Sequence, residues 1–172
     1  MSTPRLELAK FSFKDVEANL KHEMTPAIMK YIRDPLPENE VMQKSIEVAA
    51  PWQGIEGQWS LLSIRLKSTN EFIGILSMCY ESIENDTIEL GWRLHPNFHR
   101  KGYAFEAAES FLNSVKSKLK PHKIVAYCVA ENTASSKMMK KLGMTQEGCL
   151  KQFSKLNGHW CDEDVFGLVI DY

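Results

Sequence analysis

The sequence has no long run of apolar residues, no internal repeat and no Gly/Ser-rich or low-complexity linker in its 172 residues. Because no apolar segment is long enough to span a bilayer or is followed by a cleavage site, we expect neither a membrane protein nor a secreted one. A charge of one sign is also missing, since 21 basic residues stand against 22 acidic ones. That balance disfavours general binding to nucleic acid or to an anionic membrane. We expect a cytoplasmic protein with one domain over residues 1–172.

Cysteine is scarce, and no two cysteines form a C-x-x-C pair. The four are Cys79, Cys128, Cys149 and Cys161. Spacing of this kind favours buried free thiols in a reducing compartment over disulfides or a zinc site. The histidines also lack the spacing of metal ligands, so we predict that the protein binds no metal.

The hydrophobic pattern divides the chain into strands and helices in a definite order. Strands are predicted over residues 5–11, 58–66, 72–80, 87–94, 121–129, 148–156 and 159–170. Helices are predicted over residues 12–20, 25–32, 38–50, 132–143 and from residue 103 onward. Asn157-Gly158 is the strongest turn signal and predicts a hairpin between the last two strands. The mixture indicates an α+β protein, with helices packed on the faces of a central sheet.

The segment "HPNFHRKGYAFEAAESFL", residues 95–112, places basic residues and a glycine before an amphipathic helix. The first N–H groups of a helix lack internal partners and carry the positive end of its dipole, so this end can bind a phosphate. Gly102 would let the backbone approach closely. A surface helix start with chance basic residues explains the fragment equally well. Two other phosphate loops, G-x-x-x-x-G-K-[ST] and G-x-G-x-x-G, are absent, which excludes nucleotide hydrolysis and dinucleotide redox chemistry.

Three segments in this order, "RKGYA", "ENTASSKMMKKLGM" and "EGCLKQFSKLNGHWCDEDVFGL", resemble the GNAT superfamily of acetyl-CoA-dependent N-acetyltransferases, and within it the RimJ/RimL branch. The resemblance covers nearly the whole chain. It implies an α+β GNAT fold, whose central, mostly antiparallel sheet of six to seven strands is flanked by helices. It also implies acetyl-CoA as cosubstrate.

The resemblance further implies which residues would hold the coenzyme. The family's loop motif, Q/R-x-x-G-x-G/A, falls on His99, Arg100, Lys101, Gly102, Tyr103 and Ala104. Backbone amides of this loop would bind the pyrophosphate, and the first position departs from the family in being histidine. The strand at Trp92, Arg93 and Leu94 would pair with the pantetheine amides.

Two further coenzyme contacts are implied on the segment after the fifth predicted strand. The side chain of Asn132 would bind the pantetheine arm, although an asparagine at a helix start is also a good N-cap. Lys137, with Lys140 and Lys141, could meet the 3′-phosphate, and a solvated helix face explains the same lysines.

Acetyl transfer to an amine requires a base, stabilisation of an oxyanion and a proton for the leaving thiolate. Glu89 lies on the strand that leads into the loop, where partial burial would raise its pKa and suit it as the base. Glu71 and Glu81 are the alternatives. Ser135 resembles the serine that protonates the thiolate in some relatives, with a helix-capping role and Ser136 as competing readings. The resemblance implies that the oxyanion would meet a strand amide near Leu94.

The predicted function is therefore acetyl transfer from acetyl-CoA to a primary amine by direct attack in a ternary complex. The branch favours the N-terminal α-amine of a protein or peptide, such as a ribosomal protein. Two alternatives remain open: a small amine such as a polyamine, amino acid or antibiotic, and a non-catalytic module that binds or senses acyl-CoA. The amine acceptor is the expected partner, and the protein is expected to be a monomer or a homodimer.

Overall fold

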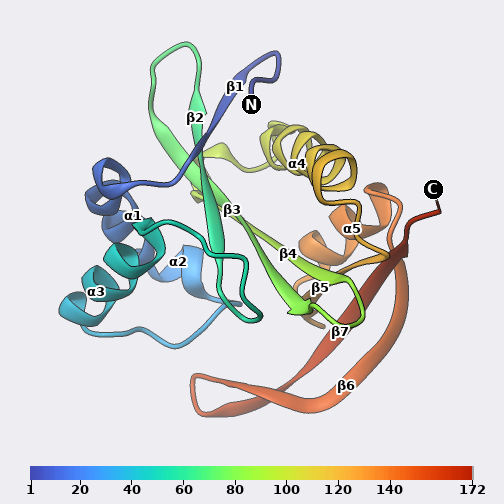
Figure 1. Cartoon of the computed structure of the whole chain (residues 1–172). Helices are drawn as coiled ribbons and strands as arrows, with labels where there is room; N and C mark the ends of the chain where they lie inside the picture. The colour runs from blue at the N-terminus through green and yellow to red at the C-terminus, as the bar shows by residue number, and fades with distance from the viewer. Residues whose placement is uncertain (172) are drawn as a thin grey trace.

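A seven-stranded sheet with the order β1-β2-β3-β4-β5-β7-β6 runs through a computed structural model that describes residues 1–171 (Figure 1). The strands are β1 (Leu6–Lys10), β2 (Ser60–Leu66), β3 (Phe72–Ser82), β4 (Thr87–Leu94), β5 (Lys123–Val129), β6 (Thr145–Leu156) and β7 (His159–Val169). All neighbouring pairs are antiparallel except β4 and β5. The predicted α+β class and the mostly antiparallel sheet are confirmed.

Helices cover both faces of this sheet. They are α1 (Val16–Glu23), α2 (Pro26–Met29), α3 (Glu38–Ala49), α4 (Tyr103–Leu119) and α5 (Thr133–Lys141), with short 3-10 turns at Phe13–Asp15 and Pro96–Phe98. α1, α2 and α3 lie on one face, and α4 and α5 lie on the other (Figure 1). The predicted order of elements is confirmed. None of the helices that residues 1–171 form is long and apolar enough to cross a membrane.

The two faces of the sheet have separate apolar cores. The larger core lies under α4 and α5 and includes Ile88, Leu90, Phe111 and Phe166. The smaller core lies under α1 and α3. Because side chains alternate between the two faces of a strand, the odd-numbered residues of β4 face α1 and α3.

The only parallel pair in the described sheet is also the place where it opens. β4 pairs with β5 at Thr87, Ile88 and Glu89, and the pairing ends there. β3, on the other side of β4, continues to pair as far as Leu94. The edge of β4 from Leu90 to Leu94 therefore faces a gap between two diverging strands.

β6 and β7 form a long hairpin that projects from the body of the protein (Figure 1). Asn157 and Gly158 form its turn with φ values of 51° and 80°, as the Asn-Gly signal predicts. The prediction of four buried thiols is wrong on this hairpin, where Cys149 is exposed and Cys161 is half-buried. The hairpin extends beyond the helices, and β6 is exposed along most of its length (Figure 1). Cys79 and Cys128 are buried, and all four cysteines are free thiols.

Candidate active site

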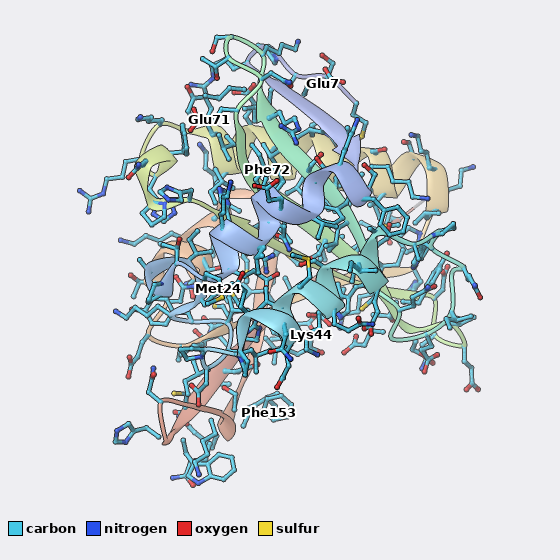
Figure 2. The ribbon with its side chains drawn as sticks, turned by 90° about the vertical axis from the view of Figure 1, so that its left-hand side faces the viewer. Glu7, Met24, Lys44, Glu71, Phe72 and Phe153 are labelled. Atoms are coloured by element: carbon cyan, nitrogen blue, oxygen red, sulfur yellow. The ribbon has the colours of Figure 1, made fainter. Side chains whose placement is uncertain are left out.

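A cavity of about 570 Å³ crosses the sheet at the gap between β4 and β5. Its wall on the α5 side includes Asn132, Ser135 and Met139, and its wall on the opposite side includes Glu23, Arg33, Lys44 and Ser45. Between them, β4 contributes the continuous stretch from Glu89 to Arg93. Figure 2 shows α1 and α3 lying across the second face, with Lys44 on α3. The cavity is thus lined by residues from both faces of the sheet.

Glu89 lies in this cavity with three acidic or sulfur-bearing neighbours. Burial, followed by the negative charges of Glu81 and Glu163, raises the pKa of Glu89 to about 7. Its Oε2 lies 4.0 Å from the Cys79 Sγ, a long and weak contact. A carboxyl group with this pKa is half ionised near neutral pH, which suits it to accept a proton.

The two alternative carboxylates are placed less favourably. Glu71 lies in the turn before β3, at the end of the sheet away from the β6–β7 hairpin, and does not line the cavity (Figure 2). Glu81 accepts a hydrogen bond from the Tyr127 hydroxyl and is not part of the lining either. Of the three acids predicted as candidates, Glu89 is the one in the cavity.

The start of α5 brings two predicted residues, Asn132 and Ser135, into the same cavity. The Oδ1 of Asn132 accepts a hydrogen bond from the Ser135 N–H at 3.3 Å and so caps the helix. Capping leaves the Nδ2 amide of Asn132 as a donor to another group. The neighbouring Ser136 points elsewhere, with its Oγ 3.5 Å from Asp164 and 3.6 Å from the Cys128 Sγ. The competing serine is therefore engaged, and Ser135 lines the cavity.

The gap-facing edge of β4 offers backbone hydrogen-bonding groups. The N–H of His95 donates to the Ile73 carbonyl on β3 at 2.9 Å. Backbone groups alternate in direction along a strand, so those of Leu90, Trp92 and Leu94 point away from β3 and into the gap. Consistent with this direction, the His99 Nε2 lies 2.9 Å from the Leu94 carbonyl oxygen.

Arg93 does not share this edge. As an odd-numbered residue, it directs its backbone groups toward β3, and its side chain binds Asn19 and Glu23 on the α1 face. The sequence analysis grouped Arg93 with Trp92 and Leu94 as contacts of the pantetheine amides. In the structure, Arg93 lies away from the gap-facing edge that the other two share.

The loop from residue 99 to 104 leads into the start of α4. Arg100 and Gly102 both have left-handed backbone conformations, with φ values of 59° and 80°. The first hydrogen bond of the helix runs from the Glu106 N–H to the Gly102 carbonyl. The N–H groups of residues 103–105 consequently have no partner within the helix and are available to an anion.

Arg5, at the start of the chain, braces this loop. Its Nη1 donates to the Lys101 carbonyl at 2.9 Å, and its Nε pairs with Glu106 at 2.6 Å. Its guanidinium also lies 4.4 Å from the centre of the Tyr103 ring. Tyr103 is thereby held against the loop and does not line the cavity.

The three lysines of α5 differ in their surroundings. Lys140 and Lys141 lie over the rings of Phe166 and Phe105, whereas Lys137 is exposed. Lys137 lies outside the cavity lining, as do all the residues of the 99–104 loop.

Comparison with known proteins identifies the family. The model of the acetyltransferase (GNAT) domain family matches residues 5–145 of the chain. The chain belongs to this family. The enzyme is similar to the N-acetyltransferase YnaD of Bacillus subtilis (strain 168), with 30% identity over 169 residues that cover 98% of this chain and 96% of YnaD.

Solved structures show the same fold. A GNAT-family acetyltransferase from Bacillus anthracis is 29% identical, has a TM-score of 0.83, and is matched over 98% of this chain and 97% of its own. RimL, the ribosomal L7/L12 alpha-N-protein acetyltransferase solved with coenzyme A, has a TM-score of 0.86 at 21% identity, with 98% and 96% covered. The protein is an N-acetyltransferase of GNAT type, a family whose acetyl donor is acetyl-CoA.

The residues present fit that donor. The loop at Gly102 supplies outward N–H groups for phosphate, the edge of β4 supplies N–H and carbonyl groups for an extended amide chain, and Asn132 and Ser135 lie beyond them. Among residues 1–171, no cluster of His, Cys, Asp or Glu could hold a metal ion.

Sequence reasoning missed several residues of the cavity, including Tyr127, Glu163, Glu23 and Arg33. Glu163 and Tyr127 lie on β7 and β5, and alternation along a strand cannot tell which of two polar positions faces a distant cleft. Glu23 and Arg33 had no motif to mark them. Glu23 pairs with both Arg33 and Arg93, and the second of these pairs joins residues 70 positions apart, so it could be seen only in three dimensions.

Proposed function

We propose that the acceptor of this N-acetyltransferase is the N-terminal α-amine of a protein or peptide, such as a ribosomal protein. The observation that carries the proposal is the charge of the cavity on the side away from α5. A polyamine requires an acidic pocket, but three acidic residues of the lining are balanced by three basic ones: Glu23, Glu89 and Glu163 against Arg33, Lys44 and Arg93. RimL, a ribosomal L7/L12 alpha-N-protein acetyltransferase, shares the fold.

We further propose how this chain holds its donor. Amides of residues 100–104 bind the pyrophosphate, the gap-facing groups of Trp92 and Leu94 pair with the pantetheine amides, and the Nδ2 of Asn132 donates to the same arm. His99 contributes by holding the Leu94 carbonyl. Lys137 is placed for the 3′-phosphate by its exposure on α5.

In the proposed chemistry the donor supplies an activated acetyl group and the protein handles the protons. Glu89 accepts a proton from the amine, directly or through one water molecule, and the hydroxyl of Ser135 donates one to the departing sulfur. The amide that stabilises the carbonyl oxygen is closer to Leu90 or Trp92 than to Leu94, because Leu94 is five residues, or about 16 Å, along the strand from Glu89.

Replacing Ser135 with alanine is expected to lower kcat by about 10-fold. A water molecule can donate the proton to the thiolate instead of the hydroxyl, but less effectively. The dissociation constant for acetyl-CoA should stay within about 2-fold of that of the unmodified protein, because the Asn132 cap binds the backbone N–H of residue 135. Ser136→Ala is the matched control, as it removes a hydroxyl one residue away that does not line the cavity. Equal losses in the two variants would contradict the assigned role.

The acceptor class is tested by measuring coenzyme A release from acetyl-CoA with two panels, one of N-terminal peptides and one of polyamines, amino acids and aminoglycosides. Turnover of one peptide class is the expected result. Preferential turnover of a small amine would replace the proposed acceptor. Absence of turnover with both panels, together with tight binding of acetyl-CoA, would favour the non-catalytic sensing module instead.

We also propose that residues 1–172 act as a single domain in the cytoplasm. One sheet includes strands from both ends of the chain, and the four free thiols fit a reducing compartment.

A further inference from the structure

Three charged side chains form a largely buried cluster at the α1 side of the cavity. The Glu23 carboxylate lies between two guanidinium groups, with its Oε1 2.6 Å from the Arg93 Nη2 and its Oε2 hydrogen-bonded to the Arg33 Nη2. The exposed fractions of these side chains are 11% for Glu23, 13% for Arg93 and 25% for Arg33. Because one negative charge faces two positive ones, the cluster has an uncompensated positive charge.

The other groups packed around the cluster do not remove this charge. Asn19 and Ser45, which bond to each other at 2.9 Å, are neutral. His22 is held neutral near pH 7, because burial lowers its pKa to about 4. The Asp34 carboxylate carries a negative charge but forms no ion pair with the described arginines of the cluster, and it accepts a hydrogen bond from the Asn157 N–H on the β6–β7 hairpin.

Arg93 lines the cavity and retains donors that bond to no described residue. Its Nη2 donates to both Asn19 and Glu23, whereas its Nε and Nη1 donate to none of the described residues. Among residues 1–171, the single side-chain polar atom that is sealed from solvent without a partner is the Ser154 Oγ. The Nε and Nη1 groups of Arg93 are therefore accessible, and Arg93 lines the cavity. A buried cation with unused donors is a site for an anion.

The opposite end of the same cavity is acidic. Glu89 and Glu163 both line it, and Glu89 lies four residues before Arg93 on β4. An even separation places the two side chains on the same face of the strand, with Cα atoms about 13 Å apart. The cavity thus presents carboxylates at one end and guanidinium groups at the other.

This polarity matches an acceptor with an amine at one end and a carboxylate at the other. The two groups of a free α-amino acid are too close together to reach both ends. Allowing for the length of the two side chains, the remaining span corresponds to two or three residues of extended peptide at about 3.3 Å each.

We propose that Arg93 and Arg33 form a carboxylate-binding subsite, so that the enzyme prefers peptide N-termini with Asp or Glu at the second or third position. This inference rests on the proposed peptide acceptor. Arg93 binds the carboxylate directly, and Arg33 keeps the cluster positive by sharing Glu23. The two arginines determine specificity and take no part in the proton transfers.

The test compares peptides that are identical except for Asp, Asn or Lys at position two and, in a second series, at position three. With the full chain at saturating acetyl-CoA, the acidic peptide of at least one series should have a kcat/KM about 10- to 100-fold above its Asn counterpart, mostly through KM. Calorimetric titration of the same peptides into the enzyme bound to coenzyme A gives a readout independent of turnover.

Arg33→Met is the main variant, since Arg33 is the more exposed arginine and Arg93→Met could leave Glu23 buried with too few partners. It should reduce the preference for the acidic peptide, measured as the ratio of kcat/KM for the Asp and Asn peptides of the same variant, to about 3-fold or less. Lys151→Met, which removes a paired cation on β6 outside the cavity, is the control and should keep the preference. Acetyl-CoA affinity in each variant reports on folding.

The outcomes separate this inference from the proposed function. Equal turnover of Asp and Asn peptides in both series would overturn the carboxylate subsite, and so would an acidic preference that persists in Arg33→Met. Neither result would contradict a peptide as the acceptor. Turnover of free small amines with none of peptides would overturn both.

Discussion

Glu89→Gln is expected to lower kcat/KM by about 10²- to 10³-fold, in line with the loss of a general base. Glutamine keeps the size and the polarity of the side chain but cannot accept a proton. Since Glu89 lies beside the gap and makes no contact with the loop at residues 99–104, the affinity for acetyl-CoA should remain within about 2-fold. Single-turnover acetylation of a peptide and titration with acetyl-CoA measure the two quantities.

The pH dependence follows from the raised pKa of Glu89. The base must be ionised, so kcat/KM should rise with pH, reach half its maximum near pH 7 and level off above it. Glu81→Gln is the matched control: it removes one of the negative charges that raise the pKa of Glu89, so the midpoint should move to lower pH while activity is retained. A profile that is flat between pH 5.5 and 8.5 would contradict the assignment.

The raised pKa of Glu89 also makes the stability of the protein depend on pH, in the opposite direction to activity. Between the ordinary value of 4.5 and about 7, the folded chain keeps a proton that the unfolded chain has lost. The contribution of Glu89 to stability is therefore fully present below pH 4.5 and is lost as the pH rises through 7. Glu89→Gln should raise the free energy of unfolding at pH 8 by about 1–2 kcal/mol and change it little at pH 4.5. Urea unfolding at the two pH values checks this, and a loss of stability at pH 8 would show that Glu89 has a stabilising partner.

Gly102→Val is expected to weaken acetyl-CoA binding by about 10- to 100-fold, measured by titration calorimetry. The φ of 80° at Gly102 is strained for any other residue, and most of all for a β-branched one. A Cβ there would also lie 3.2 Å from the Nη2 of Arg5, whose guanidinium group holds the loop in place. Valine would thus displace the backbone N–H groups at the start of α4.

Gly143→Val separates this local effect from loss of stability. Gly143 has a φ of 85°, and a Cβ there would meet no atom within 4 Å. Both variants should lose about 1–3 kcal/mol of stability to backbone strain, but only Gly102→Val should lose affinity for acetyl-CoA. Equal affinities in the two variants would mean that the loop at residues 99–104 does not bind the pyrophosphate.

Much of the fold could be predicted because its signals are local. The Asn157-Gly158 turn needs two consecutive positive φ values, which these residue types tolerate, and it formed as expected. Thr25 and Pro26 start α2, and Gly143 follows the end of α5, as the capping rules predict. The burial of Cys149 was predicted wrongly because strand propensity does not reveal whether another layer covers the strand.

The sequence by itself determined the order of the strands and helices and the positively charged turn before α4, since each depends on residues adjacent along the chain. It narrowed the candidate base to Glu89, Glu71 and Glu81, of which only Glu89 lines the cavity. Only the tertiary structure decided how these parts work together. The divergence of β4 from β5 opens the cavity, and burial, followed by the charges of carboxylates on β3 and β7, raises the pKa of Glu89. Glu23, 70 residues away, pairs with Arg93 on the α1 face. These effects depend on distance and burial between remote segments, which no local pattern encodes.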